Sequence, residues 1–193
     1  MFYSPPRFRM RSIYIDLGAN VGNTVREFLK GHPGYSCYAF EPNRALLPRI
    51  ADVALELGRD INLVWAAAWI HDGRIDLFQS DSPSASTVVE GKKEYEERGW
   101  PAIDYSRPSA SPSIDFSQWL LRNFSKDDHI VVKMDIEGAE YKVLGRMLEE
   151  GTVGLIAKLR CEWHYDRFPD MPKAEHDRIK SEVARYTILE DWE

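Results

Sequence analysis

The stretch that decides the fold is Asp16-Leu17-Gly18-Ala19-Asn20-Val21-Gly22, together with Glu41 further along the chain. An apolar run over residues 13–15 leads into the glycines, a helix-like stretch follows, and a second apolar run over residues 35–40 ends at Glu41. This order of strand, glycine turn, helix, strand and acid is typical of a nucleotide-binding βαβ unit. Glycines let the backbone approach a ligand closely. A carboxylate at the end of the second strand can accept hydrogen bonds from two ribose hydroxyls.

The residues of the turn limit which ligands fit it. A dinucleotide fingerprint, G-x-G-x-x-G, seats a pyrophosphate on a helix N-terminus, but here Asn20 stands at the middle glycine position and Asp16 precedes the turn. A carboxylate at that place repels a diphosphate and suits S-adenosylmethionine (SAM), which carries a ribose, an ammonium and a sulfonium but no phosphate. The alternative is a plain strand-to-helix turn capped by Asp16, which the position of Glu41 disfavours.

The composition indicates one globular domain, residues 1–193. Hydrophobic residues make up 44% and charged residues 29% of the 193 residues, which is enough for a single core. The net charge of -6 gives no general electrostatic attraction for nucleic acid, so we expect no nucleic-acid partner. Residues 1–11 contain three arginines and are interpreted as a solvated lead-in arm.

No apolar stretch approaches the length of a membrane span, and residues 1–11 lack the apolar centre of a signal peptide. We therefore expect a cytoplasmic location. Cys37 and Cys161 lie in apolar, strand-like runs. They are predicted to be reduced thiols in the core rather than a disulfide or a metal pair.

Strands alternate with helices along the chain, which predicts an open, mostly parallel α/β sheet. The expected strands are residues 13–17, 35–40, 61–67, 75–78, 130–134, 155–161 and 186–189. The expected helices are residues 21–30, 43–57, 115–124, 138–149 and 173–185, with a short one over 92–98. Because Asp72-Gly73 is a turn signal, the third and fourth strands are expected to form a hairpin-like extension. The segment 80–113 is rich in Ser, Pro and charge and is interpreted as a lid or substrate insertion.

A second set of polar residues follows the strand at 130–134, which is apolar on both faces and therefore expected to be central. Asp16, Glu41, Asp135 and the Glu162–His164 pair all fall at carboxyl ends of predicted strands. Ligands of open α/β sheets bind at that edge. We favour a functional role for Asp135. Two further carboxylates, Glu137 and Glu140, either function there or complement the following helix N-terminus.

These motifs together resemble the FkbM family of SAM-dependent methyltransferases. The matching segments, in order, are residues 14–23, Phe40-Glu41-Pro42-Asn43, Ser113-Ile114-Asp115, residues 132–140 and Arg160-Cys161-Glu162-Trp163-His164. The resemblance covers roughly residues 12 to 165, and Asp135-Ile136-Glu137-Gly138-Ala139-Glu140 is its strongest part.

The resemblance implies a class I methyltransferase (Rossmann-like) sandwich, with a mostly parallel seven-stranded sheet, an antiparallel last strand, and helices on both faces. It implies SAM as the cofactor and methyl transfer to an oxygen of a small molecule, sugar or lipid-like acceptor. The residues expected to bind the cofactor are Asp16, Gly18, Ala19, Asn20, Gly22, Asn23, Thr24, Glu41, Pro42, Asn43, Ala67 and Asp135.

Methyl transfer to a hydroxyl is helped by a base within hydrogen-bond reach of the acceptor. Asp135 and His164 are the candidates, and Glu137 is the third expected catalytic residue. A divalent metal held by Asp135, Glu137 and His164 is a minority interpretation, so no metal is assigned.

Two alternatives remain. One is an RNA ribose 2′-O-methyltransferase using Asp135, Lys158 and Glu162, although an acidic chain suits RNA poorly. The other is a SAM-binding module that senses rather than transfers. An open acceptor pocket beside Asp135 favours the enzyme, and an occluded one favours the sensor.

Overall fold

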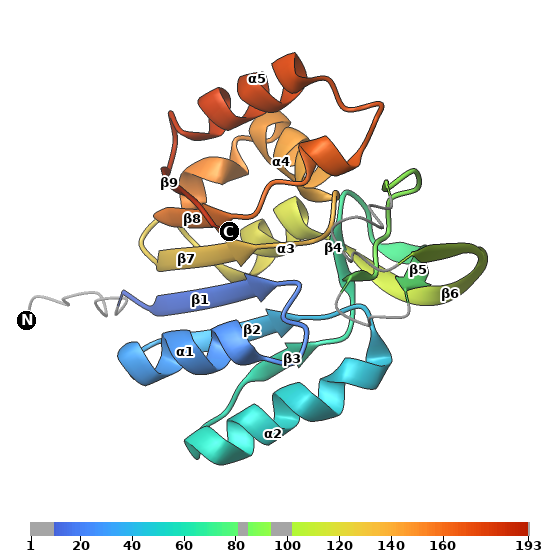
Figure 1. Ribbon diagram of the computed structural model, residues 1–193. Helices are drawn as coiled ribbons and strands as arrows, with labels where there is room; N and C mark the ends of the chain where they lie inside the picture. The colour runs from blue at the N-terminus through green and yellow to red at the C-terminus, as the bar shows by residue number, and fades with distance from the viewer. Residues whose placement is uncertain (1–9, 81–84, 94–101, 193) are drawn as a thin grey trace, which may run out of the picture.

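The computed structural model describes residues 10–80, 85–93 and 102–192 (Figure 1). Its centre is a six-stranded sheet in the order β3-β2-β1-β7-β8-β9, in which every neighbouring pair is parallel. The strands are Asn62–Val64 (β3), Ser36–Phe40 (β2), Ser12–Leu17 (β1), His129–Met134 (β7), Lys158–Cys161 (β8) and Ile188–Asp191 (β9). The predicted α/β class is confirmed, and β7 is central as expected.

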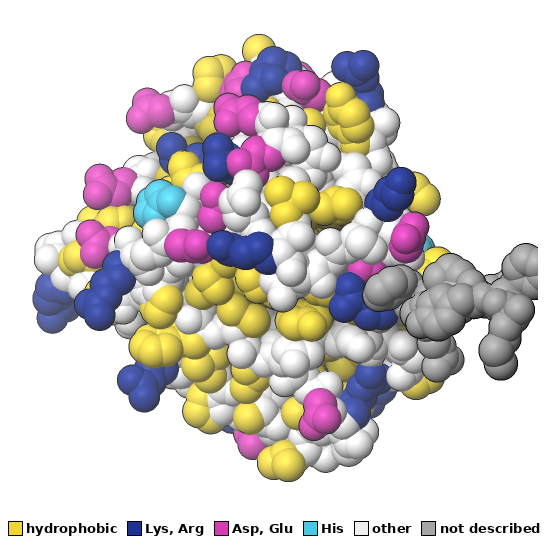
Figure 2. Space-filling model, turned by 180° about the vertical axis from the view of Figure 1, so that it is seen from behind, with side chains coloured by type: hydrophobic (Ala, Val, Ile, Leu, Met, Phe, Trp, Pro, Cys, Tyr) yellow, Lys and Arg dark blue, Asp and Glu magenta, His cyan; other side chains and the backbone are white. Residues whose placement is uncertain are grey.

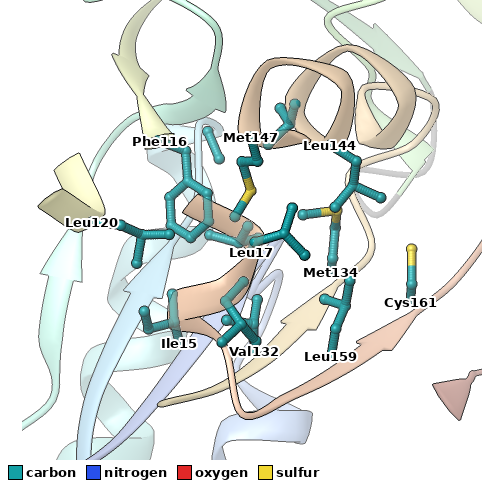
Figure 3. Packing of buried hydrophobic residues seen from close by; sticks show 14 of the residues in the cluster. Ile15, Leu17, Phe116, Leu120, Val132, Met134, Leu144, Met147, Leu159 and Cys161 are labelled. Atoms are coloured by element: carbon teal, nitrogen blue, oxygen red, sulfur yellow. The ribbon is translucent and has the colours of Figure 1, made fainter. Parts of the chain in front are cut away.

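Helices cover both faces of this sheet (Figure 1). They are Asn23–Gly31 (α1), Leu47–Leu57 (α2), Phe116–Asn123 (α3), Glu140–Glu149 (α4) and Lys173–Val183 (α5). Side chains of β1 alternate between the faces, as the period of a strand requires. Tyr14 packs in a cluster with residues of α1 and α2, whereas Ile15 and Leu17 pack with residues of α3 and α4. Figure 3 shows the cluster that contains Ile15 and Leu17, with Leu17 surrounded by apolar side chains that include Phe116 of α3.

The expectation of a seventh, antiparallel strand is wrong for the part of the chain that the structure describes. The last strand of the central sheet there, β9, pairs in parallel with β8, with Lys158 opposite Ile188. The reason is the crossover: α5 separates β8 from β9, so the chain re-enters the sheet at the same end. A helical crossover of this kind is the usual connection between parallel strands.

A second sheet of three strands, in the order β4-β6-β5, lies beyond the carboxyl edge of the first (Figure 1). Its strands are Ala67–Trp69 (β4), Gly73–Ser80 (β5) and Ile103–Asp115 (β6). β6 lies in the middle, parallel to β4 and antiparallel to β5. The predicted hairpin of residues 61–67 and 75–78 is therefore wrong. The expected single strand over 61–67 divides into β3 and β4, and both β4 and β5 pair with β6.

Part of the segment 80–113, interpreted from sequence as a lid or substrate insertion, is regular structure, because residues 103–113 belong to β6. Its serines, which suggested a loop, bond to neighbouring segments: Ser111 Oγ donates to the Pro42 carbonyl at 3.1 Å and Ser113 Oγ to the His71 carbonyl at 3.1 Å. Most of the expected helix over 92–98 and most of the lead-in arm lie outside the described residues. Cys37 and Cys161 are free and buried, as predicted. Within the described ranges, no helix is both long and apolar enough to cross a membrane.

Candidate active site

A cavity with about 580 Å³ of empty space, part of it open to solvent, lies where β1, β2 and β7 end and β4 begins. Its lining combines polar groups with small or aliphatic side chains. The cavity is lined by Gly18, Asn20, Phe40, Glu41, Pro42, Ala66, Ala67, Ala68, Leu77, Ser86, Val88, Asp135, Ile136, Glu137 and Ala139.

The glycine turn brings the backbone of β1 against the end of β7. Gly18 and Ala19 both donate their N–H groups to the Phe40 carbonyl, at 3.1 and 2.9 Å. Gly18 has φ +79°, and a Cβ there would lie 1.9 Å from the Asp135 carbonyl oxygen. Only glycine fits this position. Asn20 follows in the same left-handed region, with φ 52°, a conformation that non-glycine residues adopt uncommonly and often at functional sites.

Glu41 is buried at the end of β2 and faces the cavity. Its Oε2 accepts the Asn20 N–H at 2.8 Å, and its Oε1 accepts the Asn43 N–H at 2.7 Å. Burial raises the pKa of Glu41 to about 7, although the two backbone N–H groups oppose the shift. The carboxylate is thus held rigidly beside the glycine turn, and each of its oxygens keeps further capacity to accept a hydrogen bond.

The structure brings half of the predicted cofactor residues to the cavity. Those that line it are Gly18, Asn20, Glu41, Pro42, Ala67 and Asp135. The others support the turn or lie apart from the cavity wall: Asp16, Ala19, Gly22, Asn23, Thr24 and Asn43.

Three of these have other partners. Asn23 accepts a hydrogen bond from Arg26 at 2.7 Å. Asn43 caps the short helix 44–46 by accepting the Ala45 N–H at 3.1 Å. Gly22, with φ +81°, packs α1 against Val53 of α2.

Asp16 is wholly buried and engaged within the protein. Its carboxylate accepts a hydrogen bond from Thr24 Oγ1 and lies 3.3 Å from Lys133 Nζ. Lys133 Nζ also donates to the Gly18 carbonyl at 2.9 Å and lies 3.2 Å from Asp135 Oδ2. A single ammonium therefore ties the turn, β1 and the end of β7 together. The cation that faces Asp16 in the structure is Lys133, and Asp16 does not line the cavity.

His164 is fully buried, with its two ring nitrogens in different surroundings. Nδ1 is 2.9 Å from Glu140 Oε1, and Nε2 faces Asp135 Oδ1 at 3.9 Å and Glu137 Oε2 at 3.4 Å. Burial disfavours the imidazolium, but the charge of Glu140 and the neighbouring carboxylates outweigh it and raise the pKa of His164 to about 10. Burial also raises the pKa of Asp135, to about 6, with Lys133 acting against it.

Glu140 proves central, although the sequence left it between two interpretations. It is fully buried at the start of α4, and it accepts the N–H groups of Ile136 and Gly138 at 3.0 and 2.9 Å. The same carboxylate orients the His164 ring. It therefore does two things at once: it fixes the loop between β7 and α4, and it positions His164.

Glu137 is held from outside the βα unit. It has φ 55°, its carboxylate forms an ion pair with Lys92 and lies 3.3 Å from Arg167 NH1, and its carbonyl accepts from Thr87 Oγ1 at 2.7 Å. The described strap, residues 85–93, is thus fastened to the loop after β7.

Sequence reasoning missed several residues of this site. Lys92 and Arg167 belong to no recognisable sequence motif. Only the tertiary fold brings them to Glu137. The cavity residues Ala66 and Ala68 could have been found from the sequence, because they are the neighbours of Ala67 at the end of the expected third strand.

The comparison with protein families agrees with this geometry. The methyltransferase FkbM domain matches residues 16–187. The chain belongs to the FkbM methyltransferase family. No curated protein and no solved structure matches the chain significantly. The FkbM match spans both the glycine turn and the loop after β7, so the cavity between them is the candidate active site of a methyltransferase.

Proposed function

We propose that this FkbM-family methyltransferase transfers a methyl group from SAM to a hydroxyl of a small-molecule, sugar or lipid-like acceptor. The observation that carries the proposal is that two carboxylates line the same cavity. The buried carboxylate of Glu41 and the partly exposed carboxylate of Asp135 both line it, on either side of Gly18. One acid suits a ribose and the other suits an acceptor, with the close-approach turn between them.

The residues present fit SAM. Glu41 provides acceptors for the ribose hydroxyls. The Gly18 position has no room for a side chain, so backbone is what a ligand meets there. The apolar wall, formed in part by Ala67, Leu77 and Val88, suits the faces of an adenine ring. When bound, SAM supplies an activated methyl group. The protein's tasks are to align the acceptor, exclude water and accept the hydroxyl proton.

Asp135 is the better candidate for the base. It lines the cavity with 23% of its side chain exposed, whereas His164 is wholly enclosed. A pKa near 6 leaves Asp135 ionised and able to accept a proton at neutral pH. When no ion is bound, His164, with a pKa raised to about 10, is already protonated at neutral pH and therefore cannot accept the proton of an acceptor hydroxyl. Its role is to hold and balance the carboxylates around Asp135, so we assign it a positioning role.

The alternatives are weaker on the geometry. Lys158 lies at the start of β8, opposite Val131, and its ammonium pairs with Glu190 at 2.7 Å. It therefore does not join Asp135 in the set that a ribose 2′-O-methyltransferase requires. Figure 2 shows basic and acidic side chains interspersed on one face of the molecule, without a basic stripe. Because Asp135 faces an accessible cavity, the enzyme is favoured over the sensor.

The test uses purified full-length chain and radiolabelled SAM. SAM is first titrated calorimetrically, and the chain is then assayed against a panel of sugars, lipids and aromatic alcohols. We expect one SAM per chain and label transfer to a hydroxyl acceptor. Absence of SAM binding would remove the proposal. Binding without transfer to any acceptor, including RNA, would favour the sensor.

A further inference from the structure

The geometry points to a divalent metal site formed by Asp135, Glu162 and His164, of which Asp135 lines the cavity. One ligand atom from each of these residues lies within 4.8 Å of the others. His164 Nε2 is 3.5 Å from Glu162 Oε1 and 3.9 Å from Asp135 Oδ1. With metal–ligand distances of about 2.1 Å, neighbouring ligand atoms stand roughly 3–3.5 Å apart. The two distances from His164 Nε2 are therefore close to those of a closed ligand set, whereas the separation of the two carboxylates, up to 4.8 Å, shortens by as much as about 1.3 Å when the set closes on an ion.

The buried nitrogen is the independent observation. The His164 side chain is fully buried, and its Nε2 has no hydrogen-bond partner among the described residues, although it is aimed at the carboxylates. A buried polar atom without a partner is uncommon and calls for an explanation. An ion bound among the carboxylates would take the place of the Nε2 proton and give this nitrogen a partner.

The opposite side of the ring is arranged as metal-binding histidines require. Glu140 bonds to Nδ1 at 2.9 Å, which leaves Nε2 as the free ligand. A carboxylate behind the imidazole in this way orients the ring and raises its basicity in metal sites. Glu140 is itself fixed by two backbone N–H groups. The ligand is therefore preorganised without any ion.

The charges near the set leave room for a cation. Lys133 lies against Asp135 Oδ2 at 3.2 Å, so Oδ1 is the oxygen that faces His164. Arg167 NH2 is 3.8 Å from Glu162 Oε1, beyond hydrogen-bonding distance. Glu137, by contrast, is held by Lys92 and Arg167. The ligand set therefore contains Glu162 in place of the Glu137 considered from sequence.

The combination of carboxylate and imidazole ligands indicates which ions the site prefers. Two carboxylates and one imidazole suit Mn²⁺, Fe²⁺ or Zn²⁺ better than Ca²⁺. The Asp135 and Glu162 side chains are 23% and 29% exposed, so an ion there keeps positions open to solvent. Such an ion can bind an acceptor hydroxyl and lower its pKa. This catalytic use rests on the proposed function, whereas binding of the ion does not.

The experiment titrates chelator-treated full-length chain with Mn²⁺, followed by electron paramagnetic resonance and calorimetry, and repeats the titration with Zn²⁺. Glu162→Gln is the test variant, because Glu162 is partly exposed and its loss leaves the core intact. Glu190→Gln is the matched control, since Glu190 is a carboxylate on the adjacent strand that pairs with Lys158. Circular dichroism checks that each variant is folded.

We expect one Mn²⁺ or Zn²⁺ per wild-type chain, an affinity at least tenfold weaker in Glu162→Gln, and no change in Glu190→Gln. Equal affinity in wild type and Glu162→Gln would overturn the proposal. So would the absence of binding at millimolar metal, which would leave the cluster as a buried imidazolium among carboxylates. SAM is titrated into the same samples. Metal binding without SAM binding would refute the proposed function and leave the metal site standing.

Discussion

At the scale of single residues, Glu41 links cofactor binding to pH. Its pKa is raised to about 7, so below pH 7 the carboxyl is protonated and loses acceptor capacity toward a ribose diol. SAM affinity should therefore increase roughly tenfold per pH unit up to about pH 7 and level off above it. Glu41→Gln should bind SAM at least tenfold more weakly at pH 8, because a hydrogen bond to a charged group contributes ~1.5–3 kcal/mol.

Calorimetric titrations between pH 6 and 8.5 make this measurement. Glu56→Gln is the control, since Glu56 is a carboxylate on α2 paired with Arg26 at 2.7 Å and apart from the cavity. It should retain the wild-type curve. A wild-type affinity that is independent of pH would contradict the role of Glu41.

A variant of Asp135 can distinguish an effect on methyl transfer from an effect on SAM binding. It lines the cavity, and Lys133 supports it from behind. Asp135→Asn preserves size and removes the base, so SAM affinity should stay within a few-fold while turnover falls by about 10² or more. Initial rates on one confirmed acceptor, with SAM and Mn²⁺ binding measured separately, distinguish a base from a metal ligand. Near-normal turnover would exclude a base at Asp135, and loss of SAM binding would make it a cofactor ligand.

At the scale of elements, the contact of the β1 turn with the end of β7 depends on Gly18. A Cβ at this position would lie 1.9 Å from a backbone oxygen, and the residue has a positive φ. Gly18→Ala should therefore lower the free energy of unfolding by more than the ~1–2 kcal/mol that the left-handed conformation alone costs. It should also weaken SAM binding. Gly145→Ala in α4 is the matched control, because its Cβ meets nothing within 4 Å. It should stabilise the protein by ~0.5–1 kcal/mol. Urea unfolding of both variants tests this, and equal effects would argue against the turn.

The elements also show what the sequence could predict. The unit from β1 to Glu41 was predictable because its signals are local: glycine, alternation and the terminal acid. β6 was not, because its Ser- and Pro-rich residues form a strand only by pairing with β4 and β5, far away in the sequence. The site divides in the same way. Asp135 and Glu41 follow from their strand ends, whereas Lys92 and Arg167 reach Glu137 only through tertiary packing.

At the scale of the whole molecule, the entry to β1 is fastened to the entry to β7. Arg11 donates to both carboxylate oxygens of Asp128, at 2.7 and 2.5 Å, and its guanidinium lies 5.3 Å from the centre of the Phe124 ring. The Arg11 hydrogen bonds lower the pKa of Asp128 to about 2. Because this folded-state pKa lies below the unfolded value of about 4, the pair stabilises the fold above pH 4, and this contribution is lost as the pH falls from 4 to 2.

Asp128→Asn should therefore lower the free energy of unfolding by about 1 kcal/mol at pH 7, a modest value because the Arg11 side chain is 52% exposed and solvent screens the pair. The difference from wild type should shrink below pH 4 and vanish near pH 2. Asp127→Asn is the control, since this neighbouring aspartate is exposed, and it should change stability little at any pH. Urea unfolding at pH 7, 5 and 3 follows the trend. A destabilisation by Asp128→Asn that is equally large at pH 7 and pH 3 would show that packing, and not the charge on Asp128, joins the two central strands.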